Sequence, residues 1–332
     1  MAGGAAPRHK NFIGERIARG RFGRDNFFDR RVKELAADNE KIIALSADLT
    51  RTSGLEQFAS AFPDRMYNVG IAEENAIGMA AGLADQGFVP FVTTFANFAA
   101  LRANEFVRHF MAYMNCNVKL VGLGSGFAME FFGTTHYGLE DIAVLRSMPN
   151  ITIFSPADGL ETAVITDYAS KNPGPVYIRL SGKMNAPIIH KTGFEFIPGK
   201  ALKLAEGRKA VVYATGSMVS TALKAAKKLS ENNIDIAVYD IHTIKPFDEQ
   251  TVIENKDIPL IVSIEEHCKT GGLGSAVAEA LSSQTSHGKH IRLGTGERYE
   301  AAGSYEYMLD IHGLTAEGLE NTIINELKGE TK

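Results

Sequence analysis

The sequence predicts an α/β protein with two doubly wound domains, each built on a mostly parallel sheet. Short apolar segments of strand length alternate with longer segments of helical periodicity along most of the 332 residues. The alternation stops at residues 183–199, where Pro187, Gly193 and Pro198 indicate a loop or linker. A chain of 332 residues suits about two domains, and a hydrophobic fraction of 45% is enough for two cores.

The first series of elements ends before this break. Its strand candidates are residues 42–45, 89–94, 118–122, 151–155 and 176–179. Its helix candidates are residues 74–86, 97–114, 139–146 and 159–170. Asp158 precedes the last of these helices and Glu161 follows three residues later, which is the spacing of a capping box. Strands that are joined by helices favour parallel pairing, because each helix carries the chain back to the same end of the sheet.

A second series of the same kind follows the break. Its strand candidates are residues 210–213, 235–239, 260–264 and 290–293, with 202–204 as an edge strand, and its helix candidates are residues 219–232 and 274–283. We therefore divide the chain into an N-terminal arm (1–21), a first domain (22–182), a linker (183–199) and a second domain (200–332). The arm is rich in basic residues, and we expect it to be solvated or to face a partner.

The composition excludes several classes of function. A formal net charge of −4 gives no basic surface for nucleic acid. No apolar run approaches the roughly 18 residues that a membrane-spanning helix needs, and no secretory signal is visible. Cys116 and Cys268 lie far apart and in no ligand-like spacing, as expected for reduced thiols rather than for a disulfide or a zinc site. We expect a cytoplasmic protein that binds neither nucleic acid nor membranes.

Glu73 is the first candidate for chemistry. It stands where a strand-end turn enters a helix that is mostly surrounded by small residues, among them Gly78, Ala80 and Gly82. Because small residues permit close packing, we expect this helix to be buried, and a buried carboxylate is costly unless it is paired or protonated. The structural alternative is that Glu73 and Glu74 together stabilise the start of the helix.

Two longer segments carry a resemblance to a known family. The first reads Tyr-Asn-Val-Gly-Ile-Ala-Glu-Glu-Asn-Ala at residues 67–76. The second reads Gly-Thr-Thr-His-Tyr-Gly at residues 133–138, with Leu-Arg-Ser-Met-Pro-Asn at residues 145–150. They resemble the pyrimidine-binding half of transketolase-type thiamine diphosphate enzymes, and the second series resembles the C-terminal domain of that family. The Gly-Asp-Gly loop that holds the cofactor's diphosphate through Mg²⁺ in the family does not occur in these residues.

The resemblance implies roles for five residues. In the family, the glutamate at the position of Glu73 shares a proton with N1′ of the aminopyrimidine and favours the imino form that removes the C2 proton. Phe95 and Phe98 match rings that enclose the pyrimidine, although taken alone they would be read as core residues. Asp48 matches an aspartate near the thiazolium. His136 matches a histidine that faces the 4′-amino group and the substrate, where it can move protons.

The substrate positions match the family less well. Arg24 fits an arginine, and Thr52 or Ser53 a hydroxyl, that contact sugar phosphates in the family. Phe132 replaces the aspartate that binds the donor's 2-hydroxyl, and Lys183 stands near the position of a phosphate-binding arginine. Lysine is a point charge without the guanidinium fork. A sugar with another terminal group, such as a sulfonate, or an apolar acyl donor therefore stays open.

The resemblance implies the C-terminal (β) subunit of a split transketolase, which transfers a two-carbon ketol unit from a ketose (phosphate) to an aldose (phosphate). The implied cofactor is thiamine diphosphate, with Mg²⁺ or Ca²⁺ bound mainly by an N-terminal partner subunit in an α₂β₂ heterotetramer. Three alternatives stay open: a deoxyxylulose-phosphate-synthase-like half, a β subunit of a 2-oxoacid dehydrogenase E1 component, and a non-catalytic regulatory paralogue.

Overall fold

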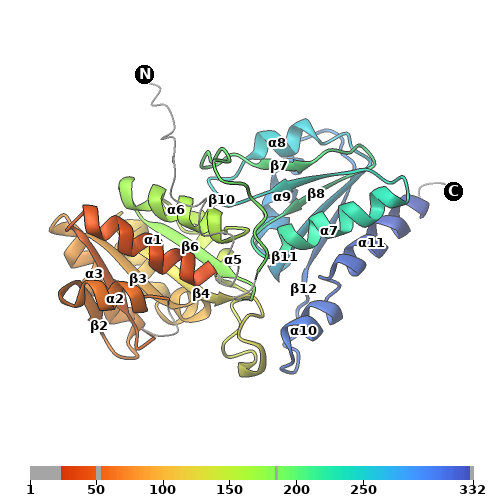
Figure 1. Cartoon of the computed structure of the whole chain (residues 1–332). Helices are drawn as coiled ribbons and strands as arrows, with labels where there is room; N and C mark the ends of the chain where they lie inside the picture. The colour runs from red at the N-terminus through yellow and green to blue at the C-terminus, as the bar shows by residue number, and fades with distance from the viewer. Residues whose placement is uncertain (1–23, 50–53, 184–185, 330–332) are drawn as a thin grey trace, which may run out of the picture.

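The computed structural model describes residues 24–49, 54–183 and 186–329, so the N-terminal arm lies outside the described residues. The described chain forms two sheets that lie side by side, with helices on both faces of each (Figure 1). The strand order is β10-β5-β6-β4-β3-β1-β2 in the seven-stranded sheet and β12-β11-β8-β9-β7 in the five-stranded sheet. The expected α/β class with two doubly wound domains is confirmed.

The seven-stranded sheet contains all the strands expected from the first series. Its strands are β1 (Ile42–Ser46), β2 (Met66–Asn68), β3 (Val89–Phe95), β4 (Lys119–Ser125), β5 (Thr152–Phe154), β6 (Val176–Ser181) and β10 (Thr243–Lys245). All pairs are parallel except that of β5 with β10. The sequence did not indicate β2 and β10, because a strand of three residues is too short to show a pattern.

Successive residues of each strand point to opposite faces of this sheet, and each face carries its own helices. Ile42 and Ala44 pack in one core cluster with Phe28, whereas Ile43 packs in another with Ala76. The helical segments of this half are α1 (Arg24–Asp38), α2 (Glu56–Ala61), η2 (Pro63–Arg65), α3 (Glu73–Asp85), η3 (Phe98–Arg102), α4 (Asn104–Phe106), η4 (Val107–Tyr113), η5 (Glu130–Phe132), α5 (Asp141–Arg146) and α6 (Gly159–Lys171). Of these, α1 and α2 were not expected from the sequence.

Helix α6 has the N-terminal cap that the sequence predicts, with one difference. Asp158 caps α6 by accepting a hydrogen bond from the amide of Glu161 at 2.9 Å. The Glu161 carboxylate accepts a hydrogen bond from the amide of Ala157 at 2.6 Å rather than from that of the cap residue.

The helix expected at residues 97–114 is present as consecutive segments, two of which are wound as π-helix. Such wide turns are frequent at functional sites.

The five-stranded sheet contains the strands expected from the second series. They are β7 (Leu202–Ala205), β8 (Ala210–Ala214), β9 (Ile236–Asp240), β11 (Leu260–Cys268) and β12 (Lys289–Thr295). The edge strand β7 is antiparallel to β9, and the other pairs are parallel. The helices are α7 (Met218–Glu231), α8 (Glu249–Glu254), α9 (Leu273–Ser282), α10 (Tyr305–Ile311) and α11 (Ala316–Gly329), of which only α7 and α9 were expected. Within the described residues, no helix combines the length and the apolar character needed to cross a bilayer.

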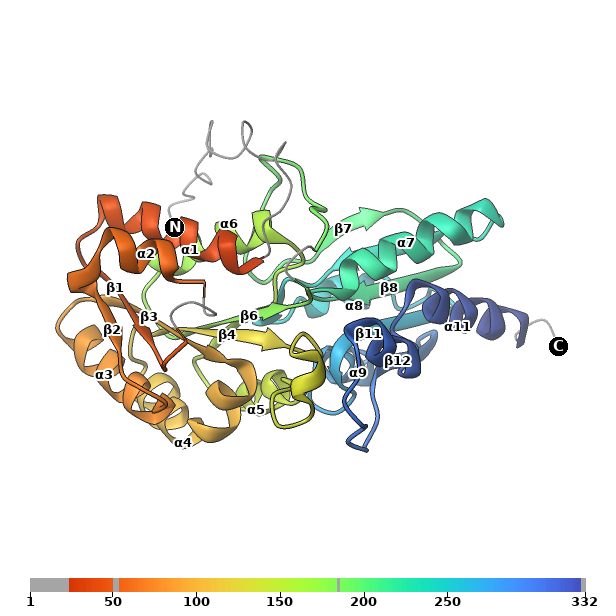
Figure 2. The same ribbon diagram turned by 60° about the horizontal axis from the view of Figure 1, so that its bottom comes forward.

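A buried arginine joins the two sheets. Arg179 lies in β6 with a side chain that is 1% exposed, and its Nε donates to Oδ2 of Asp141 at 2.9 Å. Its Nη2 donates to the carbonyl oxygens of Gly138 and Glu266, each at 2.9 Å. Tyr177 donates its hydroxyl to the same Asp141 carboxylate at 2.7 Å. Strands β4 and β6 both point towards the second sheet (Figure 2). The guanidinium on β6 therefore reaches three segments at once: the loop after β4 through Gly138, the start of α5 through Asp141, and strand β11 through Glu266.

We predict that Asp141→Ala destabilises the fold by about 3–5 kcal/mol, because it leaves the Arg179 guanidinium buried without a counter-charge. The free energy of unfolding from urea denaturation measures this loss. Lys203→Ala is the control, since it removes an exposed ion pair with Glu206 at 2.6 Å whose loss costs about 0–1 kcal/mol. If both variants lost equally little stability, Asp141 would not be what keeps Arg179 buried.

Candidate active site

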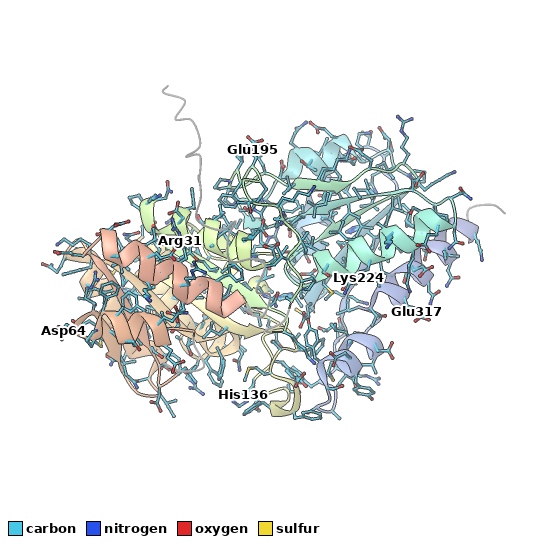
Figure 3. The ribbon with its side chains drawn as sticks, in the orientation of Figure 1. Arg31, Asp64, His136, Glu195, Lys224 and Glu317 are labelled. Carbon is cyan, nitrogen blue, oxygen red and sulfur yellow. The ribbon has the colours of Figure 1, made fainter. Side chains whose placement is uncertain are left out.

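The expected site residues gather at one edge of the first sheet, where its parallel strands end. Asp48 follows β1, Glu73 follows β2, and Phe95 is the last residue of β3. His136 lies on the loop that follows β4, at the lower edge of the molecule in Figure 3. Open α/β sheets bind their ligands outside the carboxyl ends of the strands. This edge is therefore the candidate active site.

Glu73 is the first residue of α3, and its side chain is 2% exposed. Its Oε2 accepts a hydrogen bond from Nη1 of Arg102 at 2.9 Å. Its Oε1 accepts a longer hydrogen bond of 3.4 Å from the hydroxyl of Thr94. The carboxylate is thus out of water and paired with a cation, which offsets the cost of burying its charge.

Arg102 was not anticipated from the sequence. Its guanidinium lies over the ring of Phe98, 4.1 Å from the ring centroid, while it also binds Glu73. The spacing of four residues between Phe98 and Arg102 could have indicated that they share a helical face. The contact with Glu73 joins residues 29 positions apart, so it depends on the fold. Arg102 is 40% exposed, which leaves part of its side chain in solvent.

His136 lies among three phenylalanine rings. Its ring centroid is 5.4 Å from that of Phe98, 6.0 Å from that of Phe95 and 5.2 Å from that of Phe132. Phe95 and Phe98 are 5.9 Å apart, with ring planes tilted by 59°. Phe132 is 66% exposed and forms the outer side of the group. Aromatic faces of this kind can enclose a flat heterocycle.

Asn97 holds the loop that carries His136, and the sequence did not single it out. Its Nδ2 donates to the carbonyl oxygen of Thr135 at 2.6 Å, and the Thr135 hydroxyl lies 2.9 Å from Nδ1 of His136. The Oδ1 atom of Asn97 is buried and has no hydrogen-bond partner among the described residues. Because buried acceptors are nearly always paired, this atom is a candidate acceptor for a donor group of a bound ligand.

Asp48 is exposed at the end of β1, and its backbone is left-handed, with a φ of 60°. The Asn68 side chain accepts a hydrogen bond from the Asp48 amide at 3.2 Å and donates one to the Asp48 carboxylate at 3.1 Å. The Gly70 amide donates to the same Asn68 oxygen at 3.0 Å. Asn68 therefore forms an Asx turn, and it holds the Asp48 carboxylate beside the turn that leads to Glu73.

The substrate residues expected from the sequence are less clearly placed. Lys183 forms ion pairs with Glu130 at 3.0 Å and with Glu306 at 2.8 Å. Hydrogen bonds to Glu306 and Glu130 raise the pKa of Lys183. Two carboxylates thus neutralise its charge, which leaves it poorly prepared to bind a phosphate. The side chain of Arg24 and the whole of Thr52 lie outside the described residues.

Glu266 ties the loop after β4 to the second domain. Its Oε1 accepts a hydrogen bond from the amide of Phe127 at 2.6 Å, and its Oε2 accepts the hydroxyls of Tyr305, at 2.7 Å, and of Ser217. Burial raises the pKa of Glu266 against these bonds. A Cβ at Gly126, where φ is 70°, would collide with Oε1. The loop is therefore packed directly onto Glu266, with room for glycine alone.

We predict that Asn97→Ala loosens the loop at residues 133–137, because the Thr135 carbonyl loses its amide partner. Amide hydrogen exchange in this loop should accelerate about tenfold, the value of one hydrogen bond of ordinary strength. Asn104→Ala is the matched control, since its amide binds the carbonyl of Ala100 at 2.9 Å within the same helical region. Equal protection in the wild type and the Asn97 variant would show that the loop is held by other contacts.

Comparison with known protein families identifies two matching domains. Residues 25–187 match the family described as transketolase, pyrimidine binding domain. Residues 199–319 match the family described as transketolase, C-terminal domain. The first match covers the candidate active site, and the second covers the five-stranded sheet.

Curated proteins match the chain over most of its length. The chain is 36% identical over 299 residues to the putative transketolase C-terminal section of Methanocaldococcus jannaschii, covering 90% of this chain and 94% of the relative. It is 40% identical to a subunit of the apulose-4-phosphate transketolase of Actinobacillus succinogenes, covering 84% of this chain and 90% of that protein. It is 37% identical to the SqwH subunit of the 6-deoxy-6-sulfo-D-fructose transketolase of Clostridium sp., covering 88% and 90%.

A solved structure agrees with these relatives. It is described as a split gene transketolase, inactive beta4 tetramer, and it matches with a TM-score of 0.83 at 36% identity. The match covers 93% of this chain and 99% of that chain. By sequence and by structure, this chain belongs to the transketolase family, as the part that carries the pyrimidine-binding and C-terminal domains.

Proposed function

We propose that this chain is the C-terminal subunit of a two-component transketolase, which transfers a two-carbon ketol unit from a ketose to an aldose. The observation that carries the proposal is the buried Glu73 carboxylate beside the rings of Phe95, Phe98 and His136. The names of the relatives, which are sections or subunits of transketolases, support it. Thiamine diphosphate would supply the electron sink that allows a carbon–carbon bond to break and form.

The side chains at this edge fit the aminopyrimidine of that cofactor. Glu73 would hold and release the proton at N1′, as a positioned carboxyl group does in general acid–base catalysis. Phe95 and Phe98 would enclose the ring. His136 would lie beside the 4′-amino group and the substrate, where an imidazole can give or accept a proton. Asp48 would place a negative charge near the cationic thiazolium.

The contact with Arg102 makes the two carboxylate oxygens of Glu73 different from each other. The guanidinium occupies Oε2 at 2.9 Å, whereas Oε1 has the longer hydrogen bond from Thr94 at 3.4 Å. We therefore assign Oε1 to N1′ of the cofactor. In this arrangement Arg102 is a positioning residue that fixes the carboxylate in one orientation beside Phe98.

A second polypeptide would hold the diphosphate together with Mg²⁺ or Ca²⁺. Large apolar side chains are exposed on β2, on the turn between β2 and α3, on α3, and between β3 and β4. Exposed apolar surface of this kind marks contacts with other chains. These side chains are Tyr67, Ile71, Met79, Leu101, Phe106, Tyr113 and Met114. We propose that this face contacts the N-terminal transketolase subunit, in a symmetric α₂β₂ assembly.

The residues on the outer side of the site differ from those that bind sugar phosphates in the family. Phe132 presents an exposed ring where the family has an aspartate, and Lys183 is already neutralised by two carboxylates. By name, two relatives act on apulose 4-phosphate and on 6-deoxy-6-sulfo-D-fructose. We therefore propose a sugar with a phosphate or a sulfonate group as substrate, bound without the aspartate contact to the donor's 2-hydroxyl.

The remaining expectations stay part of the proposal. We assign residues 22–182 to the pyrimidine-binding domain, 183–199 to a linker and 200–332 to the C-terminal domain. A cytoplasmic location is supported by Cys116 and Cys268, which are both free thiols in the structure.

We predict that Glu73→Gln, assayed in the complex with the partner subunit, slows hydrogen–deuterium exchange at C2 of bound thiamine diphosphate about a hundredfold or more, because the amide cannot take up the N1′ proton. Proton NMR of quenched samples measures this rate. Glu74→Gln is the matched control at the next position of α3 and should exchange at the wild-type rate. Wild-type exchange in the Glu73 variant would remove Glu73 from the mechanism.

We predict that the purified chain has no ketol transferase turnover by itself and gains it when the partner subunit is added. Ile71→Glu, at a side chain that is 75% exposed, should block this gain because it places a charge in the apolar face. Ile311→Glu is the control at an exposed isoleucine of α10, outside that face. Sedimentation mass and a coupled transketolase assay report assembly and activity. Substantial turnover of the isolated chain would contradict the two-component proposal.

A further inference from the structure

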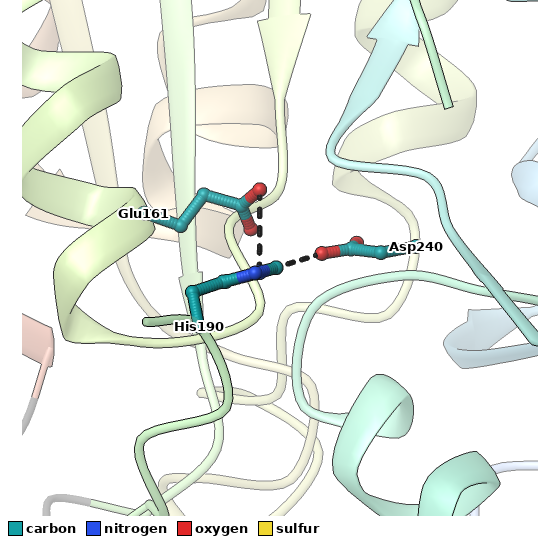
Figure 4. A group of neighbouring side chains, drawn as sticks. All are labelled: Glu161, His190 and Asp240. Atoms are coloured by element: carbon teal, nitrogen blue, oxygen red, sulfur yellow. Dashed lines mark hydrogen bonds and ion pairs between the residues drawn. The ribbon is translucent and has the colours of Figure 1, made fainter. Parts of the chain in front are cut away.

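A second cluster of titratable side chains contains none of the residues of the candidate active site. Glu161 belongs to α6, His190 to the segment after β6, and Asp240 to the end of β9, and the three meet between the two sheets (Figure 4). Nε2 of His190 lies 3.0 Å from Oδ2 of Asp240 and 3.6 Å from Oε1 of Glu161. The ring of Phe194 stacks on that of His190 at 4.4 Å and fixes its orientation.

The cluster is buried, and two of its oxygens lack a partner. The side chains of Glu161 and Asp240 are 0% exposed and that of His190 is 2% exposed. Oε1 of Glu161 and Oδ1 of Asp240 receive no hydrogen bond from any described residue. The nearby donors are engaged elsewhere, since the amide of Ala157 binds Oε2 of Glu161 and the amide of His190 binds Asp158. A buried carboxylate oxygen that accepts no hydrogen bond is costly, so the cluster has two acceptor atoms for a further cation or donor beside His190.

The charges of the cluster favour a cation at the same place. Burial opposes charge on His190, but its hydrogen bond to Asp240 and its attraction to both carboxylates raise the pKa of the imidazole to about 10. Burial and the charge of Glu161 raise the pKa of Asp240 well above its ordinary value. Both shifts show that the two buried carboxylates repel each other and attract positive charge. A divalent cation between them would offset this repulsion and would give the orphaned oxygens a partner.

The donor atoms suit a zinc-class ion. Zinc binds histidine nitrogen and carboxylate oxygen at about 2.0–2.2 Å, and tetrahedral ligands at that length lie about 3.3 Å apart. The observed separations of 3.0 Å and 3.6 Å lie on either side of this value. Mg²⁺ and Ca²⁺ prefer about six or more oxygen ligands, which this cluster does not offer.

We propose that Glu161, His190 and Asp240 bind a divalent transition-metal ion of the zinc class. The ion would join helix α6 of the first domain, the connecting segment and strand β9 of the second domain. Binding would release the imidazolium proton of His190 to solvent, because a metal ion binds the neutral imidazole.

The first test is zinc binding to the full, untagged chain after treatment with a chelator. Calorimetry in buffers of different protonation enthalpy should show about one ion bound per chain with net release of protons. The melting temperature should rise with zinc, because the ion binds the folded state. His190→Gln and Asp240→Asn should lose this binding, whereas His287→Ala, which removes an exposed histidine, should retain it.

A second measurement decides the question even if the cluster variants fold poorly. Crystals of the wild-type chain soaked in zinc should give an anomalous peak at the zinc edge between the three side chains. No peak there, or zinc uptake by the wild type that does not exceed uptake by His190→Gln, would overturn the proposal. The cluster would then be an ion pair that shares protons.

Discussion

The guanidinium of Arg179 is the constraint on which the geometry of the chain depends. Its charge is 1% exposed, so every hydrogen bond that it donates replaces one to water. Asp141 supplies the counter-charge, and the carbonyl oxygens of Gly138 and Glu266 accept the remaining bonds that fix the domain junction. A shift of any of these segments would break a hydrogen bond to a buried charge. One core cluster also contains residues of both sheets, so apolar packing and this network favour the same arrangement.

The candidate site depends on this junction through the loop after β4. Gly126 and Gly138 exchange backbone hydrogen bonds of 2.8 Å and 3.2 Å across the base of the loop that carries His136. Arg179 holds the carbonyl of Gly138, and Glu266 holds the residue that follows Gly126. The second domain therefore fixes the base of the loop, and none of its described side chains belongs to the aromatic group around His136.

Much of the fold could be predicted from the sequence because most of the longer strands, such as Ile42–Ser46, are buried apolar runs that end at a polar turn. The same reasoning could not find β10, since its three residues pair with a strand of the other domain and carry no pattern of their own. Glu73 and His136 could be predicted because the segments around them resemble a family. Arg102 could not, because its position opposite Glu73 follows from the fold and not from neighbouring residues. The cluster around His190 could not be predicted either, because its members lie far apart in the sequence and meet only in the fold.

Under the proposed function, the Glu73 carboxyl group has two tasks that need different contacts. The side chain has to stay in one orientation, which the hydrogen bond of 2.9 Å from Arg102 provides. It also has to exchange a proton with N1′, which needs an oxygen that is not bound by the guanidinium. The two oxygens divide these tasks, because Arg102 binds Oε2 and Oε1 has the longer hydrogen bond of 3.4 Å from Thr94. One oxygen can then keep the side chain in place while the other exchanges the proton.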